Sequence, residues 1–180
     1  SLHDALPILM ETADIAALTS TQAEKLTTQA VAALTTDQIK ALSSAALNAL
    51  SSDQIKAIEA EDVTAMTTEQ VKNLSTTQVT RLTTEQMEAL TTGQIQALTT
   101  AQVSALTSLQ INKMASDDLQ ALLTSQIRAL TSDQINDIST DQISNLTTSQ
   151  VAALSTAQTS ALTSGQIDSM TSGQLGALNF

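Results

Sequence analysis

The stretch Leu82-Thr83-Thr84-Glu85-Gln86-Met87-Glu88-Ala89-Leu90 contains a complete start signal for an α-helix. Thr83 and Gln86 have the spacing of a capping box, in which the Thr hydroxyl accepts from the Gln backbone N–H and the Gln side chain accepts from the Thr N–H. Leu82 and Met87 have the spacing of a hydrophobic staple across the same cap. Glu85 lies in the first turn, where a negative charge interacts favourably with the helix dipole. The stretch therefore predicts a helix that begins directly after Thr83.

This pattern repeats every eight residues along nearly the whole chain. A large aliphatic residue occupies every eighth position from Met10 to Leu178. A second series precedes the first by three residues from Ile15 onward, and Ala23 and Thr159 are its weak members. Self-similarity at a fixed period is the sequence signature of a repeat architecture.

The residue between the two series is usually Ala, which favours a helix. The same position also holds Asn73, Arg81, Lys113 and Asp137, so we expect it to be partly exposed.

The helix-start signal recurs with the same period. Of the twenty cap positions, which run from residue 19 to residue 171 in steps of eight, seventeen are Ser or Thr. The exceptions are Glu59, Ala115 and Leu123. Fifteen of the twenty combine a Ser or Thr cap with Gln three residues later. One such match would mean little, but fifteen in register predict that a new helix begins in every octapeptide.

Three backbone structures compete for this pattern. In one continuous helix, the apolar face would rotate by roughly 80° per octapeptide at 3.6 residues per turn, so no stripe could stay buried. A heptad coiled coil is excluded for the same reason. A β-solenoid is the alternative that we retain, because Thr, Val and Ile favour strands, although the apolar residues do not alternate with period two. The capping boxes favour an all-α superhelical solenoid of helices about six to seven residues long, one per repeat.

Such short helices need their neighbours. An isolated helix below roughly 12–15 residues is marginal in water, and two buried aliphatic side chains do not offset the entropy of ordering eight residues. Stacking of adjacent repeats must supply the difference, as in other solenoids. We expect residues 10–180 to form a single solenoid belonging to a longer array. The pairs Asp37/Lys40, Asp53/Lys56 and Glu69/Lys72 recur every sixteen residues, which leaves a two-helix unit as an alternative to a single octapeptide.

The start of the chain does not follow the repeat. Residues 1–8, Ser-Leu-His-Asp-Ala-Leu-Pro-Ile, resemble a translated sequencing adapter of the kind found at the ends of assembled metagenomic genes. We therefore interpret the non-repeat segment 1–9 as an artefact, the alternative being a genuine N-terminal cap. It contains the single His, His3, and the single Pro of the chain.

Few residues could carry chemistry. Two acidic groups, Glu59/Glu61/Asp62 and Asp117/Asp118, could resemble an acid–base pair or a calcium site, but they have no Gly-rich ligand loop beside them. We interpret them as solvated helix starts. The chain shows no phosphate-binding Gly loop and no Ser/His/Asp set. We interpret the Met residues at positions 66, 87, 114 and 170 as core. The sequence thus predicts no catalytic, cofactor-binding or metal-binding residue, and no enzymatic activity.

The residue after each cap is not explained by capping. It is Ser or Thr in nineteen of twenty repeats, and Ala60 is the exception. We expect its hydroxyl to satisfy a carbonyl left free at the end of the preceding helix. The alternative is an exposed array of hydroxyls that binds glycans, carries sugars or orders water as ice-binding surfaces do.

Composition limits the partners. The net charge of −11 disfavours nucleic acid, and the absence of Cys excludes disulfides and thiolate metal sites. No apolar run reaches the roughly 18 residues of a membrane span. We expect no cofactor. A protein or glycan partner is an alternative, as is end-to-end or lateral self-association.

The unit Leu-Thr-Thr-x-Gln-Ile/Val-x-Ala-Leu resembles tandem octapeptide arrays of large bacterial proteins that carry haem-utilisation or adhesion-like labels. The resemblance covers residues 10–178 and implies a secreted or cell-surface repeat region that provides length and display. It implies nothing about haem, because the repeats contain no His, Cys or Tyr to ligate iron. The expected function is a non-enzymatic structural or adhesive spacer of an extracellular or cell-surface protein. The alternative is a solenoid that binds a protein or glycan.

Overall fold

The computed structural model describes residues 10–179 and confirms the all-α prediction. The described residues form helices joined by tight connections and contain no strand, so the β-solenoid alternative was wrong. The predictions about the adapter-like residues 1–8 and about His3 lie outside the described residues.

The chain divides into two compact units, Ser1–Ala97 and Leu98–Phe180. In the first unit the described helices are α1 (Thr12–Ala16), α2 (Ser20–Ala23), α3 (Thr28–Ala32), α4 (Thr36–Ala41), α5 (Ser44–Ala49), α6 (Ser52–Ala57), α7 (Ala60–Ala65), α8 (Thr68–Asn73), α9 (Thr76–Val79), α10 (Thr84–Glu88) and α11 (Thr92–Ala97). In the second unit they are α12 (Thr100–Ala105), α13 (Ser108–Lys113), α14 (Ser116–Ala121), α15 (Thr124–Ala129), α16 (Ser132–Asp137), α17 (Thr140–Ser144), α18 (Thr148–Ala152), α19 (Thr156–Ser160), α20 (Ser164–Ser169) and α21 (Ser172–Leu175).

The predicted helix start is present in α10. Thr83 is the N-cap, and its Oγ1 accepts from the backbone N–H of Gln86 at 3.2 Å. The Oε1 of Gln86 in turn accepts from the backbone N–H of Thr83 at 2.8 Å. Leu82 and Met87 are both buried, as the staple requires. The capping box is therefore confirmed in the repeat where the sequence predicts it, and both predicted staple residues lie in the core.

The helices end earlier than predicted. They span four to six residues, whereas the sequence suggested six to seven. At the end of α8, for example, Leu74 has φ −58° and ψ 137°, which is outside the helical region. The aliphatic residue of the first series therefore leaves the helix and starts the connection, and the next cap follows at once.

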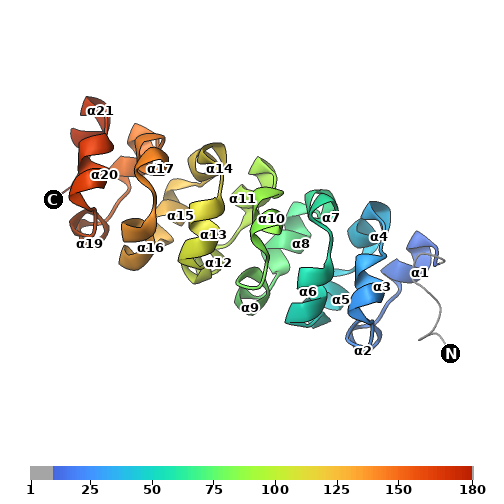
Figure 1. Cartoon of the computed structure of the whole chain (residues 1–180). Helices are drawn as coiled ribbons and strands as arrows, with labels where there is room; N and C mark the ends of the chain where they lie inside the picture. The colour runs from blue at the N-terminus through green and yellow to red at the C-terminus, as the bar shows by residue number, and fades with distance from the viewer. Residues whose placement is uncertain (1–9, 180) are drawn as a thin grey trace. The chain divides into compact units, whose positions relative to one another are not determined.

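Within each unit, every helix packs against the third helix along the chain (Figure 1). The pairs of the first unit are α1·α4, α2·α5, α3·α6, α4·α7, α5·α8, α6·α9, α7·α10 and α8·α11. Those of the second are α12·α15, α13·α16, α14·α17, α15·α18, α16·α19, α17·α20 and α18·α21. Odd and even helices follow the same rule. The structural unit is therefore a single octapeptide, and the sixteen-residue alternative was wrong.

Both aliphatic series form the core of each coil, as predicted. Ile95 and Leu98 are typical members and are buried. The four Met residues at positions 66, 87, 114 and 170 are buried among them, which confirms their interpretation as core. The intervening Ala position is mostly half-buried, and Arg81 and Asp137 are exposed there, so the predicted partial exposure is confirmed.

Candidate functional site

The most regular polar feature of the structure is the row of Gln side chains three residues after each cap, which we call the glutamine ladder. Its members are Gln22, Gln38, Gln54, Gln70, Gln78, Gln86, Gln94, Gln102, Gln110, Gln126, Gln134, Gln142, Gln150, Gln158, Gln166 and Gln174. Apart from Gln22, all of them are buried, with at most 5% of the side chain exposed.

Most ladder Gln side chains use both ends of the amide. Gln54 shows the arrangement: its Oε1 accepts from the backbone N–H of its own cap, Ser51, at 2.6 Å. Its Nε2 donates to the carbonyls of Leu26, at 2.6 Å, and Ala23, at 3.1 Å. These carbonyls lie 28 and 31 residues earlier in the chain, at the C-terminal end of α2. One side chain therefore caps the start of its own helix and the end of a helix one coil earlier.

The same bonds recur in both units. In the first unit, Gln70, Gln78, Gln86 and Gln94 each donate to the carbonyls 28 and 31 residues earlier. In the second, Gln134, Gln142, Gln150, Gln158, Gln166 and Gln174 do the same. These bonds join the start of one helix to the end of the fourth helix before it, whereas packing joins each helix to the third, so one coil contains between three and four octapeptides. The ladder thus sets the register between successive coils.

The chemistry of the amide explains why this position is Gln. The start of a helix leaves N–H groups without partners, and its end leaves carbonyls without partners. Gln offers an acceptor and two donors on a side chain long enough to reach both. Glu would bring acceptors alone and place a charge beside carbonyl oxygens. A buried polar group without a partner costs about 1–3 kcal/mol. A ladder Gln gives hydrogen-bond partners to several such groups.

The hydroxyl after each cap does not have the predicted role. We expected it to satisfy a carbonyl of the preceding helix, but in residues 10–179 the ladder Nε2 atoms take those carbonyls. Ser20 donates to a backbone carbonyl, yet that carbonyl belongs to Ala45, twenty-five residues later in the chain. The prediction was wrong because it considered only sequence neighbours, whereas the carbonyls are satisfied from the next coil.

These hydroxyl residues instead lie where a helix meets its third neighbour. The Nδ2 of Asn73 lies 3.3 Å from the Oγ of Ser44, and that of Asn145 lies 3.4 Å from the Oγ of Ser116. A Cβ on Gly93 would lie 3.9 Å from the Cγ2 of Thr68, so the two helices are already in contact there. Most of these Ser and Thr side chains are exposed.

Other side-chain amides donate to backbone carbonyls at helix ends of the following coil. Gln120 Nε2 donates to the carbonyl of Asn145 at 2.6 Å, and Asn136 Nδ2 donates to that of Ala161 at 3.1 Å. Both acceptors lie twenty-five residues later. Coils are thus joined by bonds that run both backward and forward along the chain.

Two ladder positions hold Asp in place of Gln. Glu59, Glu61 and Asp117 are exposed, as a solvated helix start requires, but Asp62 and Asp118 are buried. Burial raises the pKa of the Asp62 carboxyl above its ordinary value, and the charges of Glu59 and Glu61 raise it further. The solvated interpretation was therefore wrong for these two Asp residues, because the ladder position points into the contact between coils.

The pKa of Asp118 is raised for similar reasons. Burial raises the pKa of its carboxyl above the ordinary value, although a hydrogen bond from the backbone N–H of Ala115 opposes the rise. The charge of the adjacent Asp117 acts in the same direction as burial. The carboxylate therefore replaces the acceptor half of Gln and supplies no donor when it is ionised.

One buried hydroxyl in the described residues has no hydrogen-bond partner, that of Thr159. Thr159 occupies an Ile/Val position of the second aliphatic series and is 2% exposed. The weak member noted in the sequence is thus a genuine core residue with an unpaired oxygen.

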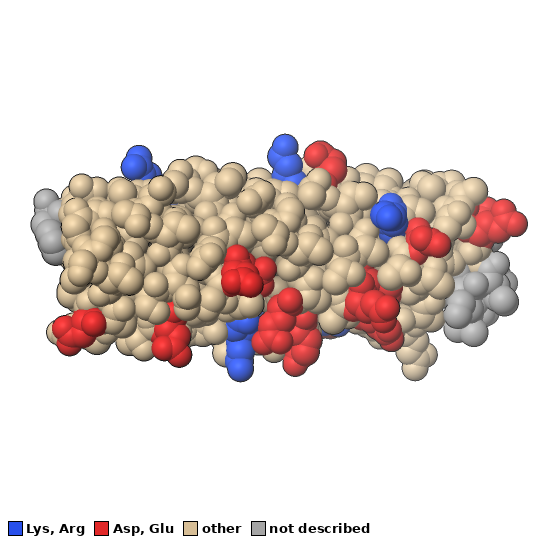
Figure 2. All heavy atoms as spheres, turned by 90° about the horizontal axis from the view of Figure 1, so that it is seen from above, with Lys and Arg blue, Asp and Glu red and all other residues tan. Residues whose placement is uncertain are grey.

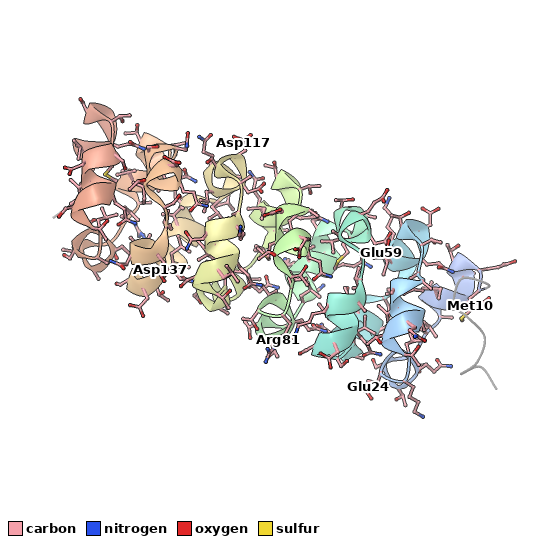
Figure 3. The ribbon with its side chains drawn as sticks, viewed as in Figure 1. Met10, Glu24, Glu59, Arg81, Asp117 and Asp137 are labelled. Carbon is pink, nitrogen blue, oxygen red and sulfur yellow. The ribbon has the colours of Figure 1, made fainter. Side chains whose placement is uncertain are left out.

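The surface carries isolated charges among uncharged residues (Figure 2). Glu24 and Arg81 point away from their helices (Figure 3). Shallow depressions occur beside Asp37 and Lys40 on α4, and beside Thr124 and Arg128 on α15. Within residues 10–179, no three acidic or His side chains lie close enough together to hold a metal ion. None of the helices in this part of the chain has the length and apolar character needed to cross a membrane.

Most of the chain matches a known repeat family. A family model described as the ALTTAQ repeat matches residues 9–44, 55–92, 87–116, 111–148 and 145–179, which together make up most of the chain. The six residues of that description occur here as Ala97-Leu98-Thr99-Thr100-Ala101-Gln102. They contain one aliphatic position, one cap and one ladder Gln. A comparison with curated proteins found no match.

Proposed function

Because the chain belongs to the ALTTAQ repeat family, we propose that it is a non-enzymatic structural spacer, with an adhesive or display role, in a bacterial surface or secreted protein. The observation that supports this role most directly is the glutamine ladder. Most repeats make the same bonds to the coil before them, so further repeats can be added without any new type of contact. An element built in this way provides reach that scales with repeat number, which is what a spacer requires.

The exposed positions fit the same role. Outside the ladder and the aliphatic series, the repeats present mainly Ser, Thr, Ala and scattered single charges. Strong protein-binding sites usually contain Trp, Tyr or Arg anchors. The chain has no Trp or Tyr, and Arg81 and Arg128 lie in different units.

Two measurements test the spacer proposal. Arrays shortened or lengthened by whole octapeptides should keep their helical circular dichroism signal per residue, and their maximum dimension in small-angle scattering should rise in proportion to repeat number. Antibodies raised against the repeats should label intact cells of the source organism, or precipitate the protein from its medium. Labelling that requires cell lysis would contradict the proposed location.

A ligand-binding surface is the second candidate. It is favoured by the exposure of fourteen of the nineteen Ser and Thr residues that follow the caps. Replacing Thr124, Thr140 and Thr148 by Val would remove three of these hydroxyls and retain the side-chain shape. Glycan-array binding or thermal hysteresis by the native protein, lost in this variant, would support binding. Absence of both signals in the native protein would remove this candidate.

A further inference from the structure

The ladder position of α7 holds a buried carboxyl that no protein group binds. Asp62 is 7% exposed, and within residues 10–179 its carboxyl accepts no hydrogen bond from its own cap or from any other residue. A buried carboxylate is costly unless it is paired with a positive charge or coordinates a metal ion. This carboxyl therefore calls for a partner that the neighbouring side chains do not supply.

The helix that carries Asp62 lies in register with the rest of the first unit. It packs against α4 and α10, which are its third neighbours along the chain in the two directions. At its C-terminal end, the carbonyls of Val63 and Met66 accept from Gln94 Nε2 at 2.7 and 2.8 Å, as in other repeats. Asp62 therefore occupies the place of a ladder Gln and faces the end of α3.

A ladder side chain faces three backbone carbonyls at that place. In the preceding repeat, Gln54 Nε2 lies within 3.4 Å of three carbonyl oxygens, those of Ala23, Glu24 and Leu26. The equivalent carbonyls for Asp62, eight residues further along the chain, are those of Val31, Ala32 and Leu34. No side chain in the described part of the molecule donates to these three. The buried carboxyl therefore faces a set of oxygen atoms and no donor.

The spacing of these oxygens suits a calcium ion. An Asp side chain is one carbon shorter than Gln, so its oxygens stop about 1.5 Å short of the place that Nε2 occupies elsewhere. Oxygens that share a Ca²⁺ ion at roughly 2.3–2.6 Å lie up to about 5 Å apart. A carboxylate and three carbonyls provide about half or more of the oxygens that Ca²⁺ takes, and waters complete the set. Mg²⁺ requires shorter bonds and stricter octahedral geometry, so it fits less well.

Two further carboxylates increase the negative potential at this place. Burial raises the pKa of Asp62, and the charges of Glu59 and Glu61 raise it further, so their potential reaches the carboxyl. Both Glu side chains are exposed, and in residues 10–179 no three acidic or His side chains converge on one point. The ligand set is therefore one carboxylate with backbone carbonyls from another coil, which a search for a Gly-rich ligand loop does not detect.

We propose that Asp62 and the carbonyls of Val31, Ala32 and Leu34 bind a calcium ion between α7 and α3. The ion takes the place of the amide donors of Gln and joins the two coils through oxygen ligands on both sides. The inference goes beyond the proposed spacer role and does not depend on it.

Carbonyl ¹³C NMR of the full chain tests the site during a titration with CaCl₂ after removal of metals by a chelator. The signals of Val31, Ala32 and Leu34 should shift together and saturate with a Kd of about 10⁻⁴–10⁻³ M, as in weak extracellular calcium modules. The carbonyls of Leu26 and Leu42 accept from Gln54 and Gln70, so their signals should stay in place. An equal Kd for MgCl₂ would overturn the assignment to calcium.

Two variants at residue 62 separate the site from the general charge of the surface. Asp62→Asn and Asp62→Gln should each raise the Kd of the shifting carbonyls by about tenfold or more, because an amide cannot replace a ligand carboxylate. Asp62→Gln restores the residue of neighbouring repeats, so we expect it to fold with unchanged helical circular dichroism. Glu61→Gln removes the same charge from an exposed position on α7 and should raise Kd by less than about threefold.

Three results would overturn the proposal. One is a native chain whose Val31, Ala32 and Leu34 carbonyl signals do not respond to calcium. Another is an undiminished calcium response in folded Asp62→Gln. The third is an equal rise in Kd for Glu61→Gln and Asp62→Gln, which would mean that surface charge alone attracts the ion.

Discussion

The repeats of α10 and α7 have the same length and differ at the two residues that cap the helix. In α10, Thr83 and Gln86 form a complete capping box, and Gln86 Nε2 also donates to the carbonyls of Ile55 and Ile58. In α7, Glu59 makes no side-chain cap bond, and Asp62 occupies the ladder position. The α14 repeat, with Ala115 and Asp118, has lost the same two residues together.

Comparing the two repeats separates the two roles of Gln, which are to accept from its own cap and to donate to the previous coil. A carboxylate can replace the acceptor, as the bond from Ala115 N–H to Asp118 demonstrates. It cannot replace the donor unless it binds a proton, and both Asp residues have raised pKa values. When ionised, these two Asp residues therefore supply no donor to the previous coil.

The largest expected effect is the removal of a ladder Gln. Gln86→Ala should lower the free energy of unfolding by about 2–4 kcal/mol, because it leaves the Thr83 N–H and two buried carbonyls unpaired. Denaturant unfolding followed by circular dichroism measures the change. The control Gln29→Ala, at an exposed position, should change stability by about 0.5 kcal/mol or less. Equal effects at the two sites would show that the ladder contributes little.

Introducing a ladder Gln into the α7 repeat should stabilise the protein. Asp62→Gln supplies a donor for the carbonyls of Val31 and Leu34, which lie 31 and 28 residues earlier, and should raise the free energy of unfolding by about 1–3 kcal/mol. Glu61→Gln removes the same charge from an exposed position on the same helix and serves as the matched control. A gain that is no larger for Asp62→Gln than for Glu61→Gln would show that charge, and not the missing donor, limits this repeat.

The unpaired hydroxyl in α19 should respond more weakly. Thr159→Val keeps the shape of the side chain and removes a buried oxygen without a partner, so we expect a gain of about 1 kcal/mol. Thr156→Val, at an exposed position of the same helix, should have little effect. Thermal and urea unfolding would detect the difference, and a destabilised Thr159→Val protein would contradict the assigned orphan hydroxyl.

The smallest effect concerns pH. Because folding raises the pKa values of Asp62 and Asp118, the folded state binds these protons more tightly than the unfolded chain, so falling pH favours folding through them. The contribution is complete below the ordinary carboxyl pKa and is lost as the pH rises through the raised values. Urea unfolding at pH 7 and pH 4 should show the native chain gaining stability relative to the Asp62→Asn/Asp118→Asn variant. An equal pH response in both proteins would contradict the burial of these carboxyls.

The sequence predicted the parts of the fold that depend on near neighbours. Thr83, Gln86 and the staple residues lie within five positions of one another, and their spacing alone defines the helix start. The second role of Gln86 depends on carbonyls 28 and 31 residues away, and those lie beside it only because the chain coils back onto the fourth helix before it. The pitch of the coil is a property of packing, and no local pattern contains it.

The burial of Asp62 could have been suspected from its register. It stands three residues after a cap position, where most other repeats have Gln, whereas its charge alone groups it with Glu59 and Glu61. The same register argument identifies Asp118 as different from Asp117. The position in the repeat was therefore more informative than residue type in deciding which carboxylates face solvent.

The coil does not contain a whole number of repeats, and this has an evolutionary consequence. Within a unit, the gain or loss of one octapeptide rotates everything downstream by between a quarter and a third of a revolution. Unequal recombination between near-identical repeats would thus alter the azimuth of whatever follows as well as its reach. Exchange of one, two or three repeats does not restore the original facing, so copy-number variation can re-aim an attached domain without a single point mutation.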